Sequence, residues 1–146
     1  MALNDYDILF ARNLETLREE ILTYKDEDDL WKLHGDIKNT PANLALHICG
    51  NLKHFIGATL GNTGYVRDRD NEFTVKGLSR EELLKEIDST IGVITPVLES
   101  LTRDDLNKAF PLDNFGEGRT VGGVITFLMF HLGYHLGQIN YHRRMF

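Results

Sequence analysis

The sequence predicts an all-α protein, folded as one antiparallel four-helix bundle domain over residues 1–146. Apolar residues recur at spacings of three and four along four long segments, which is the period of an amphipathic helix. Strand-like alternation is weak throughout, and the 146 residues contain only 3 prolines. Long helices joined by polar connections pack most naturally against one another, and the length is that of a single domain.

The first predicted helix covers about residues 2–26. Its apolar stripe consists of Phe10, Leu14, Leu17, Ile21 and Tyr24. The acidic run Asp26–Asp29 and then residues 34–39 are expected to form a connecting loop. Trp31 and Leu33 are expected to pack back from this loop onto the helices.

The second predicted helix begins at Thr40 and Pro41 and ends near residue 60. The Thr40 hydroxyl can cap the helix, and a proline costs nothing at the first helical position. Glycines within residues 61–64 end it. The charged segment 65–77 that follows is expected to be a solvated loop, although its Asp and Arg residues could instead line the entrance of a site.

The third and fourth helices complete the predicted bundle. Residues 79–82 match a capping box, which places the start of the third helix there. This helix should run to about residue 101, bent or shortened at Pro96. Residues 107–119 contain a proline and two glycines and are expected to form a loop or a small hairpin. The fourth helix is expected over about residues 120–143.

Composition excludes several classes of function. The chain carries 16 Lys+Arg against 22 Asp+Glu, a formal net charge of −6, which argues against nucleic acid and anionic membranes as partners. A single cysteine, Cys49, rules out an internal disulfide and a thiolate metal cluster. No basic leader and no apolar run long enough to span a membrane is visible, so a cytoplasmic protein is expected.

Histidine is the residue that points to chemistry. The chain has 6 histidines, and several share one face of a predicted helix with amide side chains. The stripe on the second helix holds Asn43, His47, Asn51 and His54, and the stripe on the fourth holds His131, His135, Gln138 and His142. Aliphatic residues border both stripes, so both helices should be largely buried with their histidines facing one another.

A divalent metal is the partner that converging imidazoles most readily share. Leaving buried polar groups unpaired costs roughly 1–3 kcal/mol each. His131 and His135, one helical turn apart, can chelate one ion, and His47 would supply a third ligand. Three protein ligands leave a coordination position open, as in reactive sites. The remaining stripe residues, expected to line the pocket or orient ligands, are Asn43, Asn51, His54, Gln138 and His142.

One alternative and one missing motif limit this interpretation. The histidines could simply be hydrogen-bonded core residues without a metal, which is the usual state of a histidine on an apolar face. The metallohydrolase signature is missing, because no glutamate follows His131 in the sequence HLGYH. The loop residue His34 receives no role. Gly133 and Gly137 indicate either contact with a second subunit or a tight contact within the fold.

Three segments resemble the DinB/YfiT-like superfamily over nearly the whole chain. They are PANLALHICGNLKH from residue 41, RDRDNEF from residue 67 and HLGYHLGQI from residue 131, of which the last is the most specific. The resemblance implies a four-helix bundle, commonly a homodimer, with His47, His131 and His135 binding zinc, nickel or a similar ion. Some relatives look like metal-dependent thiol S-transferases or isomerases, and others have been described as hydrolases.

The function expected from the sequence is that of a metal-dependent enzyme acting on a small molecule, with no catalytic residue assigned. Neither stripe carries a carboxylate base, which favours addition of a metal-activated low-molecular-weight thiol to an electrophile over hydrolysis. Cys49 lies off the stripe, so the thiol would come from a cofactor. A metal-dependent hydrolase and a non-catalytic, metal-stabilised homodimeric helical module remain the alternatives.

Overall fold

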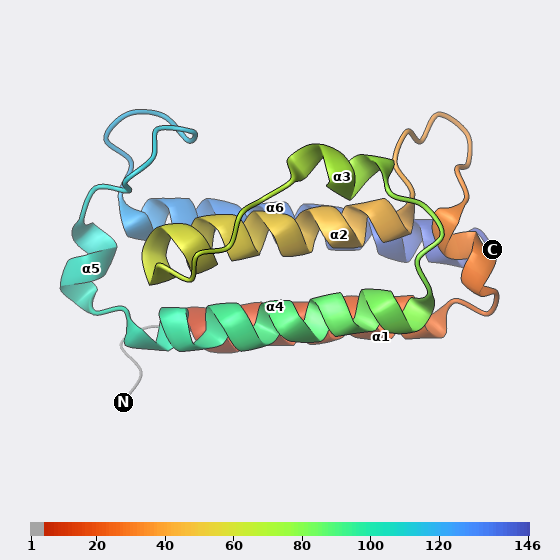
Figure 1. Cartoon of the computed structure of the whole chain (residues 1–146), viewed down its shortest axis with the longest axis horizontal. Coiled ribbons are helices and arrows are strands. Elements are labelled where there is room, and N and C mark those ends of the chain that lie inside the picture. The colour runs from red at the N-terminus through yellow and green to blue at the C-terminus, as the bar shows by residue number, and fades with distance from the viewer. Residues whose placement is uncertain (1–4) are drawn as a thin grey trace.

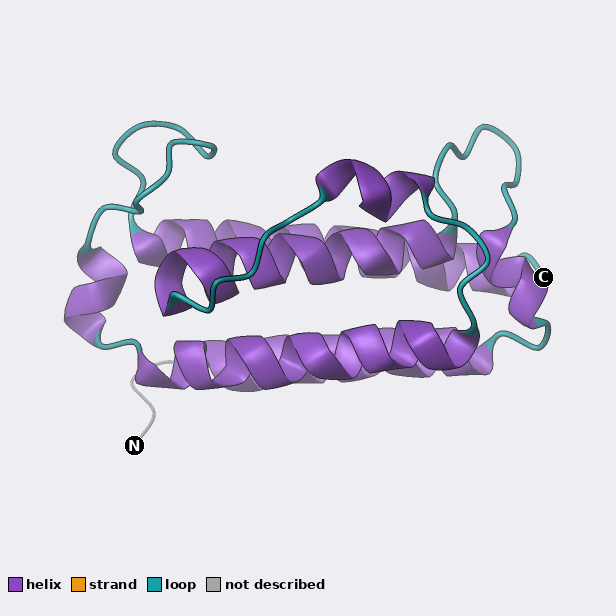
Figure 2. Cartoon of the chain, viewed as in Figure 1, coloured by secondary structure: helices purple, strands orange, loops and turns teal. Residues whose placement is uncertain are grey.

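A computed structural model describes residues 5–146, and these residues form an all-helical protein. Figure 2 shows helices joined by loops, and the only strand-like pairing among the described residues is an isolated bridge between Ala109 and Thr120. The prediction of an all-α protein is therefore confirmed. The expected beginning of the first helix at residues 2–4 lies outside the described residues.

The elements follow the predicted order, with three short additions. They are α1 (Tyr6–Thr23), the 3-10 turn η1 (Glu27–Trp31), α2 (Pro41–Leu52), the π-helical η2 (Lys53–Leu60), α3 (Arg69–Thr74), α4 (Arg80–Ser100), α5 (Arg103–Asn107) and α6 (Val121–Arg144). The Thr40 hydroxyl accepts from the backbone N–H of Asn43, and Ser79 forms the predicted capping box with Glu82. The two helix starts therefore lie where the capping residues predict them.

The long helices lie in two layers (Figure 1). α1 packs along α4 in one layer, and α2 with η2 packs along α6 in the other. Within each layer the helices are antiparallel, but α2 and α4 run in the same direction (Figure 1). The reason is the segment 61–78, here called the strap, which carries the chain back over α2 before α4 begins (Figure 1).

Apolar side chains from all the long helices meet between the layers. The stripe expected on the first helix is fully buried there. Its fully buried partners from the other helices include Ile48, Ile56, Ile94, Leu98, Ile125, Leu128, Leu132 and Ile139. Burial of each such side chain contributes roughly 1.5–3 kcal/mol, so this core fixes the relative positions of α2 and α6.

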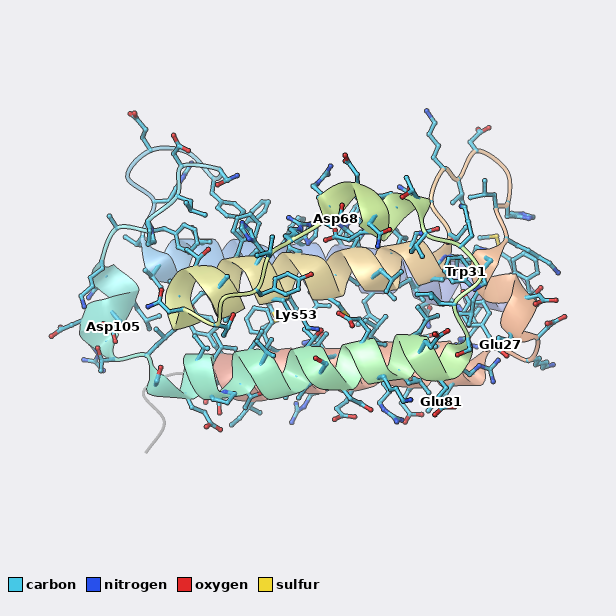
Figure 3. The ribbon with its side chains drawn as sticks, viewed as in Figure 1. Glu27, Trp31, Lys53, Asp68, Glu81 and Asp105 are labelled. Carbon is cyan, nitrogen blue, oxygen red and sulfur yellow. The ribbon has the colours of Figure 1, made fainter. Side chains whose placement is uncertain are left out.

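The loop residues Trp31 and Leu33 behave differently. The indole N–H of Trp31 donates to the Leu78 carbonyl at 3.1 Å, which joins η1 to the end of the strap. Trp31 is labelled in Figure 3. The expectation for Leu33 is wrong, since this side chain is 55% exposed. Pro96 does not end its helix either, because α4 continues to Ser100.

One face of α6 is more exposed than its apolar sequence predicts. Four aromatic residues on this face have exposed fractions between 49% and 69%. They are Phe127, Phe130, Tyr134 and Tyr141. A methyl group added at Gly133 or Gly137 would meet no atom within 4 Å, so a tight contact within the fold is wrong. The helices that pack on α6 are α1, α2 and α5, and they leave these aromatic rings largely in contact with solvent. None of the described helices combines the length and apolar character that a membrane crossing requires.

Candidate metal centre

Three histidines from two helices converge between α2 and α6. The Nε2 atom of His131 lies 3.1 Å from Nε2 of His47 and 3.1 Å from Nε2 of His135. One nitrogen from each of the three rings falls within 4.8 Å of the others, so the group could hold a metal ion. Two tetrahedral ligands on bonds of about 2.1 Å lie roughly 3.4 Å apart, which is close to these distances.

The helices bring these rings together for local reasons. His131 and His135 are one turn apart on α6 and therefore project from the same face. His47 is held opposite them because Leu44 and Ile48, its neighbours on α2, are buried in the core. His47 is itself buried, whereas His131 and His135 are half-buried, so the group is reached from the α6 side.

A buried glutamate stands behind His47, and sequence reasoning missed it. The Oε1 atom of Glu72 lies 3.0 Å from His47 Nδ1, and the Glu72 side chain is buried. Arg67 donates to both carboxylate oxygens, from Nε at 2.9 Å and from Nη2 at 3.0 Å. Burial acts to raise the pKa of Glu72, but the hydrogen bonds from His47 and Arg67 outweigh it and hold that pKa below its ordinary value. This carboxylate is therefore ionised at neutral pH.

The charged segment 65–77 was expected to be a solvated loop, but part of it forms α3. The Asp68 side chain caps α3 by accepting from the Asn71 N–H at 3.2 Å, and Figure 3 shows Asp68 at the start of this helix. α3 packs on α2 and turns Glu72 inward. The signal in the sequence is Gly50, which costs stability inside a helix unless something approaches closely.

The hydrogen bonds made by Nδ1 of His47 and His135 determine which ring nitrogens direct lone pairs at the point between the three histidines. A carboxylate only accepts, so His47 donates from Nδ1 to Glu72. His135 donates from Nδ1 to Oε1 of Gln138 at 2.7 Å. In the neutral form of each ring, His47 and His135 therefore both present a lone pair on Nε2. His131 has one ring hydrogen and cannot satisfy both of them, whereas a cation at the centre can.

The other stripe residues have separate positions. Asn43 donates from Nδ2 to the carbonyls of Glu72 and Val75, both at 3.0 Å, and so holds the strap. Asn51 is buried, and its Oδ1 atom lacks a hydrogen-bond partner. His54 contacts the ring of Phe55 and makes no hydrogen bond to the three histidines.

His142, expected at the pocket, is held at both ring nitrogens. Its Nδ1 atom lies 2.8 Å from the Tyr24 hydroxyl, and its Nε2 atom lies 2.8 Å from the Lys32 carbonyl. Because a carbonyl only accepts, Nε2 donates to it and Nδ1 accepts from Tyr24. The ring is buried and joins α6 to α1 and to the end of η1.

A pocket of about 530 Å³ opens beside the histidine group. It lies between α6 and the loop before α2, and Gln138, His135 and His142 form part of its wall. Leu44, Ile139 and Met145 contribute apolar surface, and Asp36 and Lys38 contribute polar groups. Of the predicted stripe residues, the structure therefore brings His135, Gln138 and His142 to this pocket.

Buried histidines predict that the metal-free protein loses stability in acid. Burial lowers the pKa of His131 to about 4, and it also lowers the pKa values of His54, His135 and His142. Below about pH 6.5 the unfolded chain therefore binds more protons than the folded one. We expect the urea midpoint of chelator-treated protein to be level above pH 7 and to fall steadily towards pH 4.5. A midpoint that stays level or rises on acidification would contradict this.

Together the fold and the site define an all-helical protein with a three-histidine group between two helices. A family model described as "Protein of unknown function (DUF1572)" matches residues 6–146. The chain belongs to this family, since the match covers all but the first five residues. No curated protein matches the chain.

Proposed function

We propose that the chain is a divalent-metal-dependent enzyme of the DinB/YfiT-like superfamily, in which His47, His131 and His135 bind zinc or nickel in a four-helix bundle. The observation that carries the proposal is the convergence of the three Nε2 atoms, two of them with lone pairs fixed by hydrogen bonds at Nδ1. Three neutral imidazoles are a donor set suited to these ions. Glu72 and Gln138 then orient His47 and His135.

Among metal-dependent reactions, we favour transfer of a low-molecular-weight thiol to an electrophile. A bound divalent ion lowers the pKa of a coordinated thiol or water, which makes the nucleophile available near neutral pH. Many metal-dependent hydrolases add a carboxylate that takes the proton from the attacking water. Both oxygens of Glu72 are engaged by His47 and Arg67, and within residues 5–146 no other carboxylate contacts the three histidines. A thiol, once ionised, needs no such base.

The thiol would come from a small molecule. Burial raises the pKa of Cys49 to about 12, so this thiol stays protonated. The pocket beside His135 and Gln138 has the volume of a small-molecule site, about 530 Å³. Its apolar wall and polar rim suit the carbon skeleton of an electrophile or a thiol with charged groups at one end.

The same proposal includes a cytoplasmic homodimer formed through the exposed aromatic face of α6. Phe127, Phe130, Tyr134 and Tyr141 together with the bare Gly133 and Gly137 give this face its apolar and smooth character. Apolar faces of this kind are typical of contacts between copies of one chain.

The proposed activity is tested with untagged protein loaded with Zn²⁺ or Ni²⁺, a small thiol and a chloronitrobenzene. We expect thioether formation above the uncatalysed rate, and loss of that excess on chelation. His34→Ala, which changes an exposed histidine outside the site, should react like the wild type. Turnover of esters or amides without thiol would support the hydrolase instead, and a large loss of stability on chelation without any turnover would support the non-catalytic module.

A further inference from the structure

Glu72 connects the strap to the histidine group. Asn43 holds the strap backbone through the carbonyls of Glu72 and Val75. Glu72, which belongs to the strap, accepts the shorter hydrogen bond from Nδ1 of His47, at 3.0 Å. The ring of Phe73 also lies against His47, with ring centres 4.7 Å apart. Opening of the strap would therefore leave His47 without its partner at Nδ1.

We propose that Glu72 is a positioning residue that couples metal binding to closure of the strap, a proposal that rests on the metal site proposed above. The carboxylate accepts from Nδ1 of His47, which keeps the hydrogen off Nε2 and directs that atom at the centre. Carboxylates behind metal-bound histidines typically change metal affinity by about 10–100-fold.

Glu72 also offsets a positive charge beside His47. The Nη2 atom of Arg67 lies 3.4 Å from His47 Nδ1, and Oε1 of Glu72 accepts from both nitrogens at 3.0 Å. Without that negative charge, the guanidinium would oppose a cation bound at His47. The carboxylate therefore acts on the metal centre through its charge as well as through its hydrogen bond.

The surface of α2 is shaped to admit this carboxylate. A Cβ atom at Gly50 would overlap the carboxyl group of Glu72, coming within 2.6 Å of its carbon. Gly50 is buried one turn from His47, so the contact forms only because residue 50 has no side chain. Gly50→Ala thus displaces the carboxylate while keeping every charge in the site.

Coupling between two equilibria is reciprocal. If Glu72 in place strengthens metal binding by some factor, bound metal must stabilise the closed strap by the same factor. Closure of the strap is visible in the hydrogen exchange of its backbone amides, because local opening limits exchange. Metal affinity and strap exchange are therefore two independent readouts of one contact.

The test begins with Zn²⁺ affinity, measured by competition with a chromophoric chelator. We expect Glu72→Gln and Gly50→Ala to bind Zn²⁺ about 10–100-fold more weakly than the wild type. Glu86→Gln is the control for loss of a carboxylate, since Glu86 pairs with Lys53 and touches no histidine (Lys53 is labelled in Figure 3). Gly92→Ala is the control for an added methyl group, since nothing lies within 4 Å of it.

The second arm measures hydrogen exchange over residues 65–76 with and without Zn²⁺. We expect Zn²⁺ to slow exchange there by about the same 10–100-fold in the wild type and by much less in Glu72→Gln and Gly50→Ala. Equal Zn²⁺ affinity in the wild type and both variants, or equal slowing of strap exchange, would overturn the role of Glu72 while leaving the metal site intact. A wild type that binds no Zn²⁺ would instead overturn the metal site itself. If Glu72→Gln does not fold, Gly50→Ala decides.

Discussion

Replacing His131 with alanine is expected to abolish stoichiometric metal binding. His131 is the central ring of the group, with Nε2 3.1 Å from Nε2 of both His47 and His135. Its removal leaves two nitrogens from different helices, and a chelate of two imidazoles binds a divalent ion far more weakly than three. We expect the metal content measured by elemental analysis to fall from one ion per chain to a trace.

The controls for this prediction separate the site from the rest of the chain. His34→Ala removes a histidine from the exposed loop before α2 and should leave metal content unchanged. Circular dichroism should show both variants to be helical, because His131 is half-buried and the core beneath it is apolar. Full retention of metal by His131→Ala would show that the ion binds elsewhere.

Replacing His142 with alanine is expected to cause a large loss of stability with no loss of metal. The buried imidazole pairs with the Tyr24 hydroxyl and the Lys32 carbonyl. Alanine would open a cavity, take this partner from the Lys32 carbonyl and leave the Tyr24 hydroxyl only its longer bond to the Ile139 carbonyl, at 3.3 Å. An unsatisfied buried polar group costs about 1–3 kcal/mol, to which the cavity adds, so we expect a loss of roughly 3 kcal/mol. Urea unfolding of the chelator-treated protein measures it.

His142 and His131 lie on one stripe of α6 but have different expected roles. His142 joins helices through hydrogen bonds, whereas His131 is proposed to bind the metal. His142→Ala should therefore keep the wild-type metal content while it unfolds at lower urea. If it loses metal in proportion to His131→Ala, His142 belongs to the metal centre and its assignment here is wrong.

The long helices and the histidine group were predictable because their signals are local. The capping residues Thr40 and Ser79 mark helix starts within one turn of themselves. The spacing of His131 and His135 fixes them on one face whatever packs against it. His47 required one further step, the pairing of two apolar helices, each with a polar stripe.

The position of Glu72 could not be predicted in the same way. Its burial depends on the path of the strap over α2 and on the missing side chain at Gly50, two features that lie apart in the sequence. Locally, RDRDNEF is a charged segment with every sign of a solvated loop. The direction of α4 relative to α2 is equally non-local, because it follows from where the strap delivers the chain (Figure 1).

The exposed face of α6 shows the limit of apolar periodicity. The helix is apolar around most of its circumference, which predicts burial on all sides. Phe130 is nevertheless 69% exposed and Tyr141 66% exposed, because the helices that pack on α6, namely α1, α2 and α5, leave this face uncovered. Composition alone does not distinguish a helix that is buried on all sides from a helix that keeps one apolar face exposed.

The metal content of the untagged wild-type protein, purified without nickel resin, tests the central claim most directly. Elemental analysis by mass spectrometry should find close to one divalent ion per chain, and the ion should be lost from His131→Ala and kept by His34→Ala. Folded wild-type protein without stoichiometric metal, and without affinity for added Zn²⁺ or Ni²⁺, would contradict the account. The three imidazoles would then be core side chains paired only with one another and with Glu72 and Gln138.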